Sequence, residues 1–289
     1  MTTFQRLIRF LSTDGQIYNG EALLSRGISD LSKATRAKII TGDIFGAHEV
    51  TDRIVSVEYL LTPLPVEKVR TVRCLGLNYA NHAKESGMAL PKSPVLFYKP
   101  ATSLASPNAD ISIPRVAQSP GLDYEVELVI VIGKACRDVP EKDAYKYILG
   151  YSVGNDMSHR PLQLGPGQWS LGKGFDTWAP FGPGIISTSV IKDPQSLKIA
   201  TRVNGETRQN SSTADQIFKV AETVAKLSAG TTLLPGDIIF TGTPEGVAMG
   251  GKKGEERWLK DGDVVEVELE GVGVCRNKVV FEGVGEPKL

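Results

Sequence analysis

Residues 122–134 read LDYEVELVIVIGK, and this stretch decides the fold class of the chain. Its second half, Leu128–Ile132, is an unbroken apolar run of the kind typical of a buried strand. Alternate side chains of a strand share a face, so Glu125 and Glu127 point the same way. Two negative charges at the start of a buried strand are costly unless something positive neutralises them, and a hard divalent cation is the obvious candidate. The alternative, that both glutamates face solvent or meet Lys or Arg partners, stays open on this stretch alone.

The composition favours small-molecule chemistry. The 289 residues carry 33 basic and 33 acidic side chains, and no Lys or Arg cluster forms a stripe that would follow a phosphate backbone. Nucleic acid and anionic membrane surfaces are therefore not expected as partners. We expect a small molecule instead.

The cysteines and the N-terminal stretch indicate the compartment. Cys74, Cys136 and Cys275 are odd in number, far apart and without CxxC spacing, which argues against a disulfide framework and a thiolate zinc site. Residues 1–27 hold only short apolar stretches broken by charge, so neither a secretory signal nor a membrane-spanning helix is expected. We expect a cytoplasmic protein, and a mitochondrial address stays open.

Two domains are predicted. Residues 1–65 form a small N-terminal domain that ends at the sequence TPLP, and residues 66–289 form the larger domain. The larger region consists mostly of short β-branched runs separated by Gly, Pro and Asp. This pattern predicts a mixed α/β, β-rich barrel or roll with peripheral helices.

Two helices are predicted in the larger domain. One begins at the proline of residues 140–150 and runs to the glycine that ends this range. The other has apolar residues at helical spacing over residues 217–227, with Ser212 or Thr213 as its cap and Gly230 as its stop.

Asp156 is the third acidic candidate. A strand, a turn, a helix and a returning strand after Glu127 would bring it beside the two glutamates. Three carboxylates with open water positions are what Mg²⁺ or Mn²⁺ prefers. The alternative is that Asp156 caps the turn that follows it.

Lys173 and Thr243 are candidates of another kind. Lys173 lies among Gly, Trp and Phe, a setting that suits a lysine beside a metal-bound oxyanion, although a surface loop lysine is the alternative. Thr243 follows a buried strand, where it either presents its hydroxyl or backbone N–H to a ligand or serves only in a turn.

His82 is the histidine with the most informative context. Glu85 lies three residues later, on the same helical face and within reach of the imidazole. A histidine held by a carboxylate is a general-base arrangement, and a simple surface pair is the alternative. His48 has no such context, and His159 lies close to Asp156 as either a support for that site or an exposed side chain.

Several blocks in the larger domain carry a resemblance to a known family. They are GLNYANHAKE, PVLFYKP, DYEVELVIVIGK, GYSVGNDMSHR, GKGFDTWAPFGP, VNGETRQ and PGDIIFTGTPEGVAMG. They span about Val69 to Val280 and occur in the family's order. The chain resembles the fumarylacetoacetate hydrolase superfamily, in the branch of stand-alone fumarylacetoacetase-domain proteins with acylpyruvate hydrolases and oxaloacetate tautomerases.

This resemblance implies a β-roll catalytic domain, a homodimer and Mg²⁺ or Mn²⁺ as the cofactor. By the same resemblance, the metal ligands are Glu125, Glu127 and Asp156, the catalytic residues are His82, Glu85 and Lys173, and the residues that contact the substrate's carboxylate and oxo groups are Arg160, Gln163 and Thr243.

One segment departs from the family's pattern. After the sequence DMS the relatives resemble Ala-Arg-Asp-Trp-Gln, whereas this chain has His159, Pro161 and Leu162 at the first, third and fourth of these positions. The departure leaves the metal ligands unchanged. It puts substrate choice in doubt, because it flanks the two polar residues expected to bind the substrate's carboxylate.

The activity implied is hydrolysis of a carbon–carbon bond in acylpyruvate-like 2,4-dioxo acids. A metal that binds the carboxylate and keto oxygens of a 2-oxo acid stabilises the enolate left when the neighbouring bond breaks. His82, oriented by Glu85, would deprotonate the attacking water, while Lys173 supports developing negative charge. Without an attacking water, the same site would decarboxylate oxaloacetate or interconvert its keto and enol forms, and the ligands do not decide among these reactions.

Two further readings of the sequence are less well supported. Residues 167–174, GQWSLGKG, nearly match the nucleotide-binding loop GxxxxGK[ST]. Gly174 lacks the hydroxyl that binds Mg²⁺, and the residues that follow do not suit a helix, so nucleotide binding is not expected. A non-catalytic binding module is disfavoured because the carboxylates, the lysine and the His–Glu pair are all retained.

Overall fold

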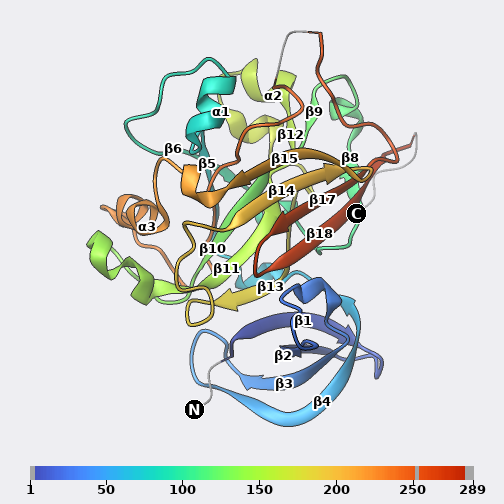
Figure 1. Cartoon of the computed structure of the whole chain (residues 1–289), viewed down its shortest axis with the longest axis vertical. Helices are drawn as coiled ribbons and strands as arrows, with labels where there is room; N and C mark the ends of the chain where they lie inside the picture. The colour runs from blue at the N-terminus through green and yellow to red at the C-terminus, as the bar shows by residue number, and fades with distance from the viewer. Residues whose placement is uncertain (1–3, 251–253, 284–289) are drawn as a thin grey trace.

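A large β-sheet forms the centre of the computed structural model, which describes residues 4–250 and 254–283 (Figure 1). Its strands are β1 Arg6–Ser12, β2 Ile17–Leu23, β3 Arg36–Gly42, β4 His48–Leu60, β5 Val72–Gly76, β6 Val95–Lys99, β7 Leu104–Ala105, β10 Val126–Ile132, β11 Ile148–Asn155, β13 Ala179–Ser187 and β16 Ile238–Phe240. They follow the order β2-β3-β4-β1-β13-β11-β10-β16-β5-β6, with β7 beside β13.

A second sheet lies across β10, β11 and β13 of the first (Figure 1). Its strands are β8 Ile111–Ile113, β14 Lys198–Val203, β15 Glu206–Ser212, β17 Val264–Leu269 and β18 Gly273–Phe281, in the order β15-β14-β17-β18-β8. Two short strands, β9 Leu122–Asp123 and β12 Ser158–His159, pair with each other. The main hydrophobic core contains residues of both sheets, such as Leu128 of β10 and Val267 of β17. The predicted β-rich fold is confirmed.

Strand β10 is buried along its whole length because both of its faces are packed. Leu128 belongs to the main core, whereas Val129 belongs to a second hydrophobic cluster. Because successive side chains of a strand point to opposite faces, Glu127 lies on the face of Val129, and Glu125 precedes it by two residues. The strand predicted from residues 122–134 is confirmed.

Strands β1 to β4 form an antiparallel unit at one end of the large sheet (Figure 1). This unit joins the rest of the sheet through the antiparallel pairing of β1 with β13, where Leu7 lies opposite Ile185. The hydrogen-bonded sheet is thus continuous between the two predicted domains. The division between residues 65 and 66 falls between β4 and β5, and it stays a prediction.

Short helices lie around the sheets. The α-helices are α1 Ala80–Glu85, α2 Arg160–Leu164 and α3 Val220–Ser228. The 3-10 helices are η1 Leu31–Lys33, η2 Val66–Lys68, η3 Ala101–Ser103, η4 Arg115–Ala117, η5 Glu141–Tyr147, η6 Trp169–Gly172 and η7 Thr213–Asp215.

The predicted helix over residues 217–227 is confirmed only in its later part. Helix α3 starts at Val220 because the backbone N–H groups just before it bond elsewhere. Ile217 donates to the backbone oxygen of Asn78, and Phe218 donates to the side-chain oxygen of the same residue, both at 2.7 Å. Ser212 caps η7 rather than α3.

The predicted helix over residues 140–150 is a 3-10 helix, and the prediction is wrong over its last three residues. Residues 141–147 form the 3-10 helix η5, and β11 begins at Ile148. Ile148 pairs with Ile132 of β10, so residues 148–150 belong to the sheet and not to a helix.

Within residues 4–250 and 254–283, no helix is long and apolar enough to cross a membrane. Cys74, Cys136 and Cys275 are buried free thiols.

Candidate metal centre and catalytic cavity

The pairing of β10 with β11 brings the three predicted carboxylates together. Val126 lies opposite Asn155, and the backbone N–H of Asp156 donates to the carbonyl of Glu125 at 2.9 Å. Glu125, Glu127 and Asp156 are all buried, and each offers a carboxylate oxygen within 4.8 Å of the others. The antiparallel return of β11 therefore produces the grouping that the sequence predicted.

Two lysines hold Asp156 and Glu125. The Nζ atom of Lys173 lies 2.8 Å from both Asp156 Oδ2 and Glu125 Oε2, and it also donates to Ser158 Oγ at 2.6 Å. The Nζ atom of Lys99 lies 2.6 Å from Asp156 Oδ1. Although burial disfavours the charged ammonium, Asp156 and Glu125 outweigh it and hold the pKa of Lys173 above its usual value.

Arg160 links Glu125 to a further buried acid, Asp123. The Nη2 atom of Arg160 lies 2.7 Å from Glu125 Oε1 and 2.7 Å from Asp123 Oδ2, and its Nε donates to Asp123 Oδ2 at 2.8 Å. Although burial favours the neutral carboxyl group, Lys173 and Arg160 outweigh it and lower the pKa of Glu125 to about 2.

Asp123 also accepts hydrogen bonds from the backbone of residues 248 and 249. Its Oδ1 accepts a hydrogen bond from the backbone N–H of Ala248 at 2.6 Å, and its Oδ2 accepts one from Met249 at 3.2 Å. The sequence reasoning did not single out Asp123 or Lys99. The pattern Asp-x-Glu-x-Glu carries a signal for Asp123, because residues two apart in an extended chain share a face.

Glu127 differs from Glu125 and Asp156 because no Lys or Arg side chain among the described residues forms an ion pair with it. Its Oε2 accepts a hydrogen bond from the backbone N–H of Gly242 at 2.6 Å, whereas its Oε1 is buried without a hydrogen-bond partner among the described residues. Burial, together with the nearby charges of Asp156 and Glu125, raises the pKa of Glu127 well above its usual value. A buried, unpartnered carboxylate oxygen is costly unless a ligand completes it.

The charges of the cluster fit a divalent cation. The acidic members are Asp123, Glu125, Glu127 and Asp156, and the basic members are Lys99, Arg160 and Lys173. With all of these ionised, four negative and three positive charges leave a net charge of −1. The unpartnered Glu127 oxygen and the all-oxygen donor set match what Mg²⁺ and Mn²⁺ prefer. A divalent cation would reverse the sign to +1, which suits an anionic substrate.

His82 and Glu85 contact each other on helix α1. The Nδ1 atom of His82 lies 3.3 Å from Glu85 Oε2, and His82 is buried. The backbone N–H of Gly246 lies 3.1 and 3.2 Å from the two carboxylate oxygens of Glu85. With Nδ1–H directed to the carboxylate, Nε2 is the ring nitrogen left to accept a proton.

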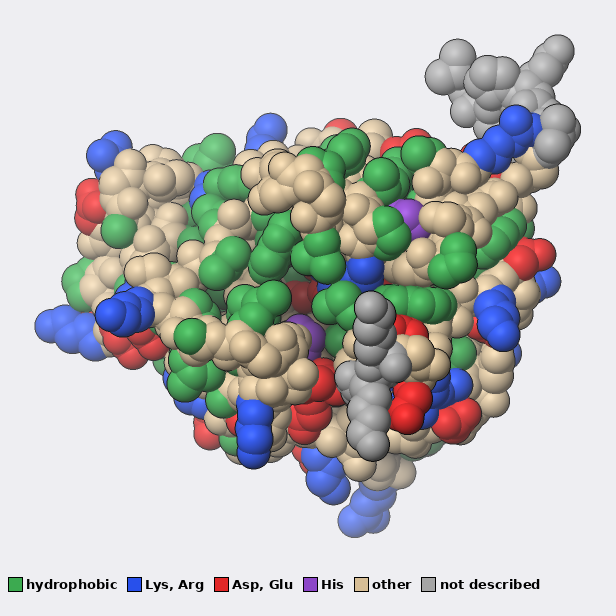
Figure 2. All heavy atoms as spheres, turned by 90° about the horizontal axis from the view of Figure 1, so that it is seen from above, with side chains coloured by type: hydrophobic (Ala, Val, Ile, Leu, Met, Phe, Trp, Pro, Cys, Tyr) green, Lys and Arg blue, Asp and Glu red, His purple; other side chains and the backbone are tan. Residues whose placement is uncertain are grey.

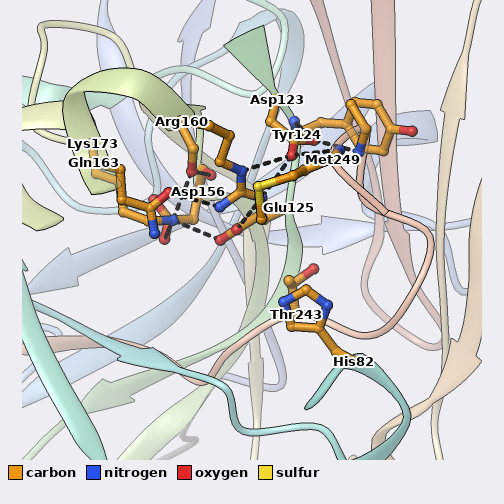
Figure 3. Close-up of polar contacts among 12 residues, drawn as sticks. His82, Asp123, Tyr124, Glu125, Asp156, Arg160, Gln163, Lys173, Thr243 and Met249 are labelled. Carbon is orange, nitrogen blue, oxygen red and sulfur yellow. Dashed lines mark hydrogen bonds and ion pairs between the residues drawn. The ribbon is translucent and has the colours of Figure 1, made fainter. Parts of the chain in front are cut away.

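A cavity of about 40 Å³ joins the two groups of residues. Its lining includes the predicted residues His82, Glu125, Arg160, Gln163, Lys173 and Thr243. Arg160 and Lys173 lie on one side of Glu125, and His82 and Thr243 lie on another (Figure 3). From outside, hydrophobic side chains surround a hollow in which basic, acidic and histidine side chains are visible (Figure 2).

Gln163 and Thr243 are both held by hydrogen bonds. Gln163 Oε1 accepts from Arg160 Nη1 at 2.8 Å, which ties the two predicted substrate contacts together. Thr243 Oγ1 accepts from Gln209 Nε2 at 2.9 Å. Both side chains are buried, so their orientation is fixed before any ligand binds.

The residues that differ from the family's pattern, His159, Pro161 and Leu162, lie outside the cavity lining. His159 Nε2 lies 3.0 Å from Ser119 Oγ, and burial lowers the pKa of this histidine. Pro161 packs against Gly121, where a Cβ atom would come within 2.4 Å of the proline ring. Neither these residues nor Leu162 is among the described side chains that line the cavity.

The segment that nearly matches a nucleotide-binding loop has a different role in the structure. Residues 169–172 form η6, and the chain continues into strand β13 rather than into a helix. The ammonium of Lys173 is buried against Glu125 and Asp156. The sequence-based argument against a phosphate-binding loop therefore holds for this segment.

Comparison with known proteins gives one consistent result. Residues 71–280 match the family described as "Fumarylacetoacetate (FAA) hydrolase C-terminal". A caffeoylpyruvate hydrolase of Neonothopanus nambi is 41% identical over 97% of this chain and 95% of its own length. A mitochondrial oxaloacetate tautomerase of Rattus norvegicus is 41% identical over 89% of this chain and 78% of its own. The crystal structure of a 2-hydroxyhepta-2,4-diene-1,7-dioate isomerase from Mycobacterium marinum is 37% identical, covers 96% of this chain and 99% of its own, and superposes with a TM-score of 0.80.

Proposed function

The chain belongs to the fumarylacetoacetate hydrolase family, and we propose that it is a divalent-metal-dependent hydrolase that cleaves a carbon–carbon bond in acylpyruvate-like 2,4-dioxo acids. One observation carries the proposal: Glu125, a member of the buried carboxylate cluster in which Glu127 has an unpartnered oxygen, lines the same cavity as His82 of the His–Glu pair. The first group suits a metal, and the second suits proton transfer to and from water. The caffeoylpyruvate hydrolase among the relatives supports an acylpyruvate substrate.

Glu125, Glu127 and Asp156 would hold the metal, which is Mg²⁺ or Mn²⁺ in this proposal. A divalent cation supplies Lewis-acid polarisation of a 2-oxo acid and charge stabilisation for the enolate that its cleavage produces. Lys99 and Lys173 keep Asp156 in place from two sides, at 2.6 and 2.8 Å. This leaves the carboxylate group oriented before the ion arrives.

Arg160 and Gln163 would bind the substrate's carboxylate. The Nε of Arg160 donates to Asp123 and its Nη1 donates to Gln163, whereas its Nη2 forms ion pairs with Asp123 and Glu125 but has no hydrogen-bond partner among the described residues. Because a guanidinium has five N–H donors, at least one donor of Arg160 is left for a further hydrogen bond. Because Arg160 lines the cavity and its plane is fixed, that donor is presented to an incoming anion.

His82 would act as the general base. Glu85 holds Nδ1, so Nε2 takes a proton from a water molecule that attacks the substrate carbonyl at C4. The C3–C4 bond then breaks, its electron pair stays with the pyruvate fragment as an enolate, and the acyl fragment leaves as a carboxylic acid. Protonation of the enolate at C3 completes the release of pyruvate. Lys173, whose positive charge is buried beside this reaction, stabilises the negative charge that develops.

Oxaloacetate chemistry is the second candidate. The oxaloacetate tautomerase of Rattus norvegicus is similar enough in sequence to raise this activity for the present chain. The same residues would then move a proton between the keto and enol forms of oxaloacetate, or decarboxylate it, without an attacking water. The two candidates share the metal ligands and differ in the use of His82.

The proposal is tested by assaying the purified chain, freed of metal with a chelator and then supplied with Mg²⁺ or Mn²⁺. The substrates are acetylpyruvate, fumarylpyruvate and oxaloacetate, and the readouts are loss of diketone or enol absorbance and release of pyruvate. Metal-dependent pyruvate release from an acylpyruvate supports hydrolysis. Turnover of oxaloacetate alone would favour the second candidate, and no metal-dependent turnover would reject both.

A further inference from the structure

An aromatic wall leads outward from the buried lysine of the site. The Nζ atom of Lys173 lies 5.1 Å from the ring centroid of Phe97, and the Phe97 ring lies 5.7 Å from that of Trp169 in an edge-on arrangement. Lys173 and Phe97 are 1% and 3% exposed, whereas Trp169 is only partly buried. The wall therefore runs from the reacting end of the cavity toward its mouth.

Gly76 provides the space in which Trp169 lies. A Cβ atom at Gly76 would come within 1.9 Å of the Trp169 indole, so this position leaves no room for a larger side chain while the indole stays in place. Gly76 ends strand β5, and it lines the cavity together with both aromatic rings. The indole is thus placed by the sheet and does not merely lie on a surface loop.

The mouth of the cavity is also apolar. Met88 and Leu164 line it and are 44% and 47% exposed. In the space-filling view, hydrophobic side chains surround the hollow (Figure 2). Exposed apolar side chains at a pocket mouth are typical of a surface that a ligand covers.

The basic side chains of the cavity already have carboxylate partners. Among the described residues, the basic members of the lining are His82, Arg160 and Lys173. Each forms an ion pair or hydrogen bond with at least one carboxylate, and Arg160 has at least one N–H donor left for the carboxylate of the 2-oxo acid. A second carboxylate on the substrate would meet Phe97, Trp169 and their apolar neighbours without a partner, which is unfavourable.

We propose that Phe97 and Trp169, with the apolar mouth, bind the acyl group, so that the preferred substrates are acylpyruvates with an apolar aromatic acyl group rather than a second carboxylate. This inference rests on the proposed function. The cavity of about 40 Å³ holds only a few water molecules at about 10–15 Å³ each, so a bulky acyl group lies along the aromatic wall toward the mouth. Trp169 is then a specificity-determining residue.

The experiment compares kcat/KM for benzoylpyruvate, acetylpyruvate and fumarylpyruvate with Mn²⁺ present. Each hydrolysis consumes one water and yields pyruvate with benzoate, acetate or fumarate. Because one methylene in an apolar pocket changes kcat/KM about 10- to 200-fold, we expect benzoylpyruvate to exceed acetylpyruvate by about tenfold or more. Fumarylpyruvate should be the poorest of the three.

Two variants test whether the aromatic wall determines the acyl-group preference. Trp169→Ala should reduce the benzoylpyruvate preference to about twofold, because kcat/KM should fall more for benzoylpyruvate than for acetylpyruvate. Leu171→Ala is the matched control, because Leu171 is an exposed residue of the same η6 helix that is not among the described lining residues. Calorimetric titration of phenylpyruvate and pyruvate gives the same comparison without turnover.

The possible outcomes have distinct meanings. Acylpyruvate cleavage with fumarylpyruvate or acetylpyruvate preferred over benzoylpyruvate overturns this inference and leaves the proposed function standing. An equal loss on all three substrates in Trp169→Ala also overturns it, because the residue would then support the site as a whole. Failure to cleave any acylpyruvate rejects the proposed function, and with it the inference.

Discussion

Two groups of residues, here called walls, meet at the cavity through Glu125 and His82, and they are built in different ways. The carboxylate wall consists of Glu125, Glu127 and Asp156 with their basic partners, and it lies on the buried strand pair β10 and β11. The histidine wall consists of His82 and Glu85 on the short helix α1, and hydrogen bonds from Gly246 to Glu85 connect it to a loop. The first wall is fixed by a sheet and by ion pairs, and the second depends on a few contacts. This difference suggests that metal binding and proton transfer can be lost separately.

The largest effect is expected from Glu127→Ala, which removes the carboxylate without a cation partner. A divalent metal at a hundredfold excess over its Kd stabilises a protein by about 2.7 kcal/mol, and this stabilisation should disappear along with activity. The measurement is thermal unfolding with and without Mn²⁺, together with the turnover assay. Glu127→Gln keeps the shape of the side chain and should behave similarly. Metal-dependent stabilisation of wild-type size in Glu127→Ala would remove Glu127 from the metal site.

The next largest effect tests the histidine wall. His82→Ala should lower kcat by about 10² to 10⁴-fold, the usual contribution of a general base. The control is His48→Ala, which changes a histidine of β4 and should leave the rate unchanged. Wild-type turnover of every substrate by His82→Ala would refute the base assignment.

A smaller effect is expected where the carboxylate wall meets the substrate. Arg160→Lys keeps the charge but loses the planar set of bonds to Asp123, Glu125 and Gln163. We expect kcat/KM to fall about 10- to 100-fold, since charged hydrogen bonds contribute about 1.5–3 kcal/mol each. Arg202→Lys, on a partly exposed ion pair with Glu268, is the control. Equal activity of Arg160→Lys and the wild type would show that the planar guanidinium is not required for substrate turnover.

The smallest effect is expected from the segment behind the cavity. Replacing His159 by Ala, Pro161 by Asp and Leu162 by Trp restores the relatives' pattern without changing a lining residue. The ratio of kcat/KM between oxaloacetate and acylpyruvates should shift about two- to fivefold, through small displacements of Arg160 and Gln163. A fixed ratio with weakened metal binding would mean that this segment supports the metal site instead.

The grouping of the three carboxylates could be predicted from the sequence, because it follows from local geometry. Strand alternation relates Glu125 to Glu127, and the return of the next strand brings Asp156 alongside. Lys99 could not be found in this way. It ends β6, at the far side of the sheet order from β11, and only the folded chain brings its ammonium to Asp156.

The start of helix α3 also depends on a long-range contact that the sequence does not reveal. Helical periodicity marked the apolar face of α3, but Asn78 takes the N–H groups of Ile217 and Phe218. A distant residue whose backbone and side-chain oxygens accept these hydrogen bonds overrides the local preference, and no pattern within residues 212–220 reveals it. The limits of the sequence reasoning are therefore set by long-range polar contacts.

Calorimetric titration of Mn²⁺ into the wild type, His82→Ala and Glu127→Gln tests whether one wall binds the metal and the other transfers the proton. We expect His82→Ala to bind Mn²⁺ with a Kd within about twofold of the wild type, a difference of about 0.4 kcal/mol. We expect no measurable binding by Glu127→Gln. Loss of Mn²⁺ binding in His82→Ala, or wild-type affinity in Glu127→Gln, would contradict this division between the walls.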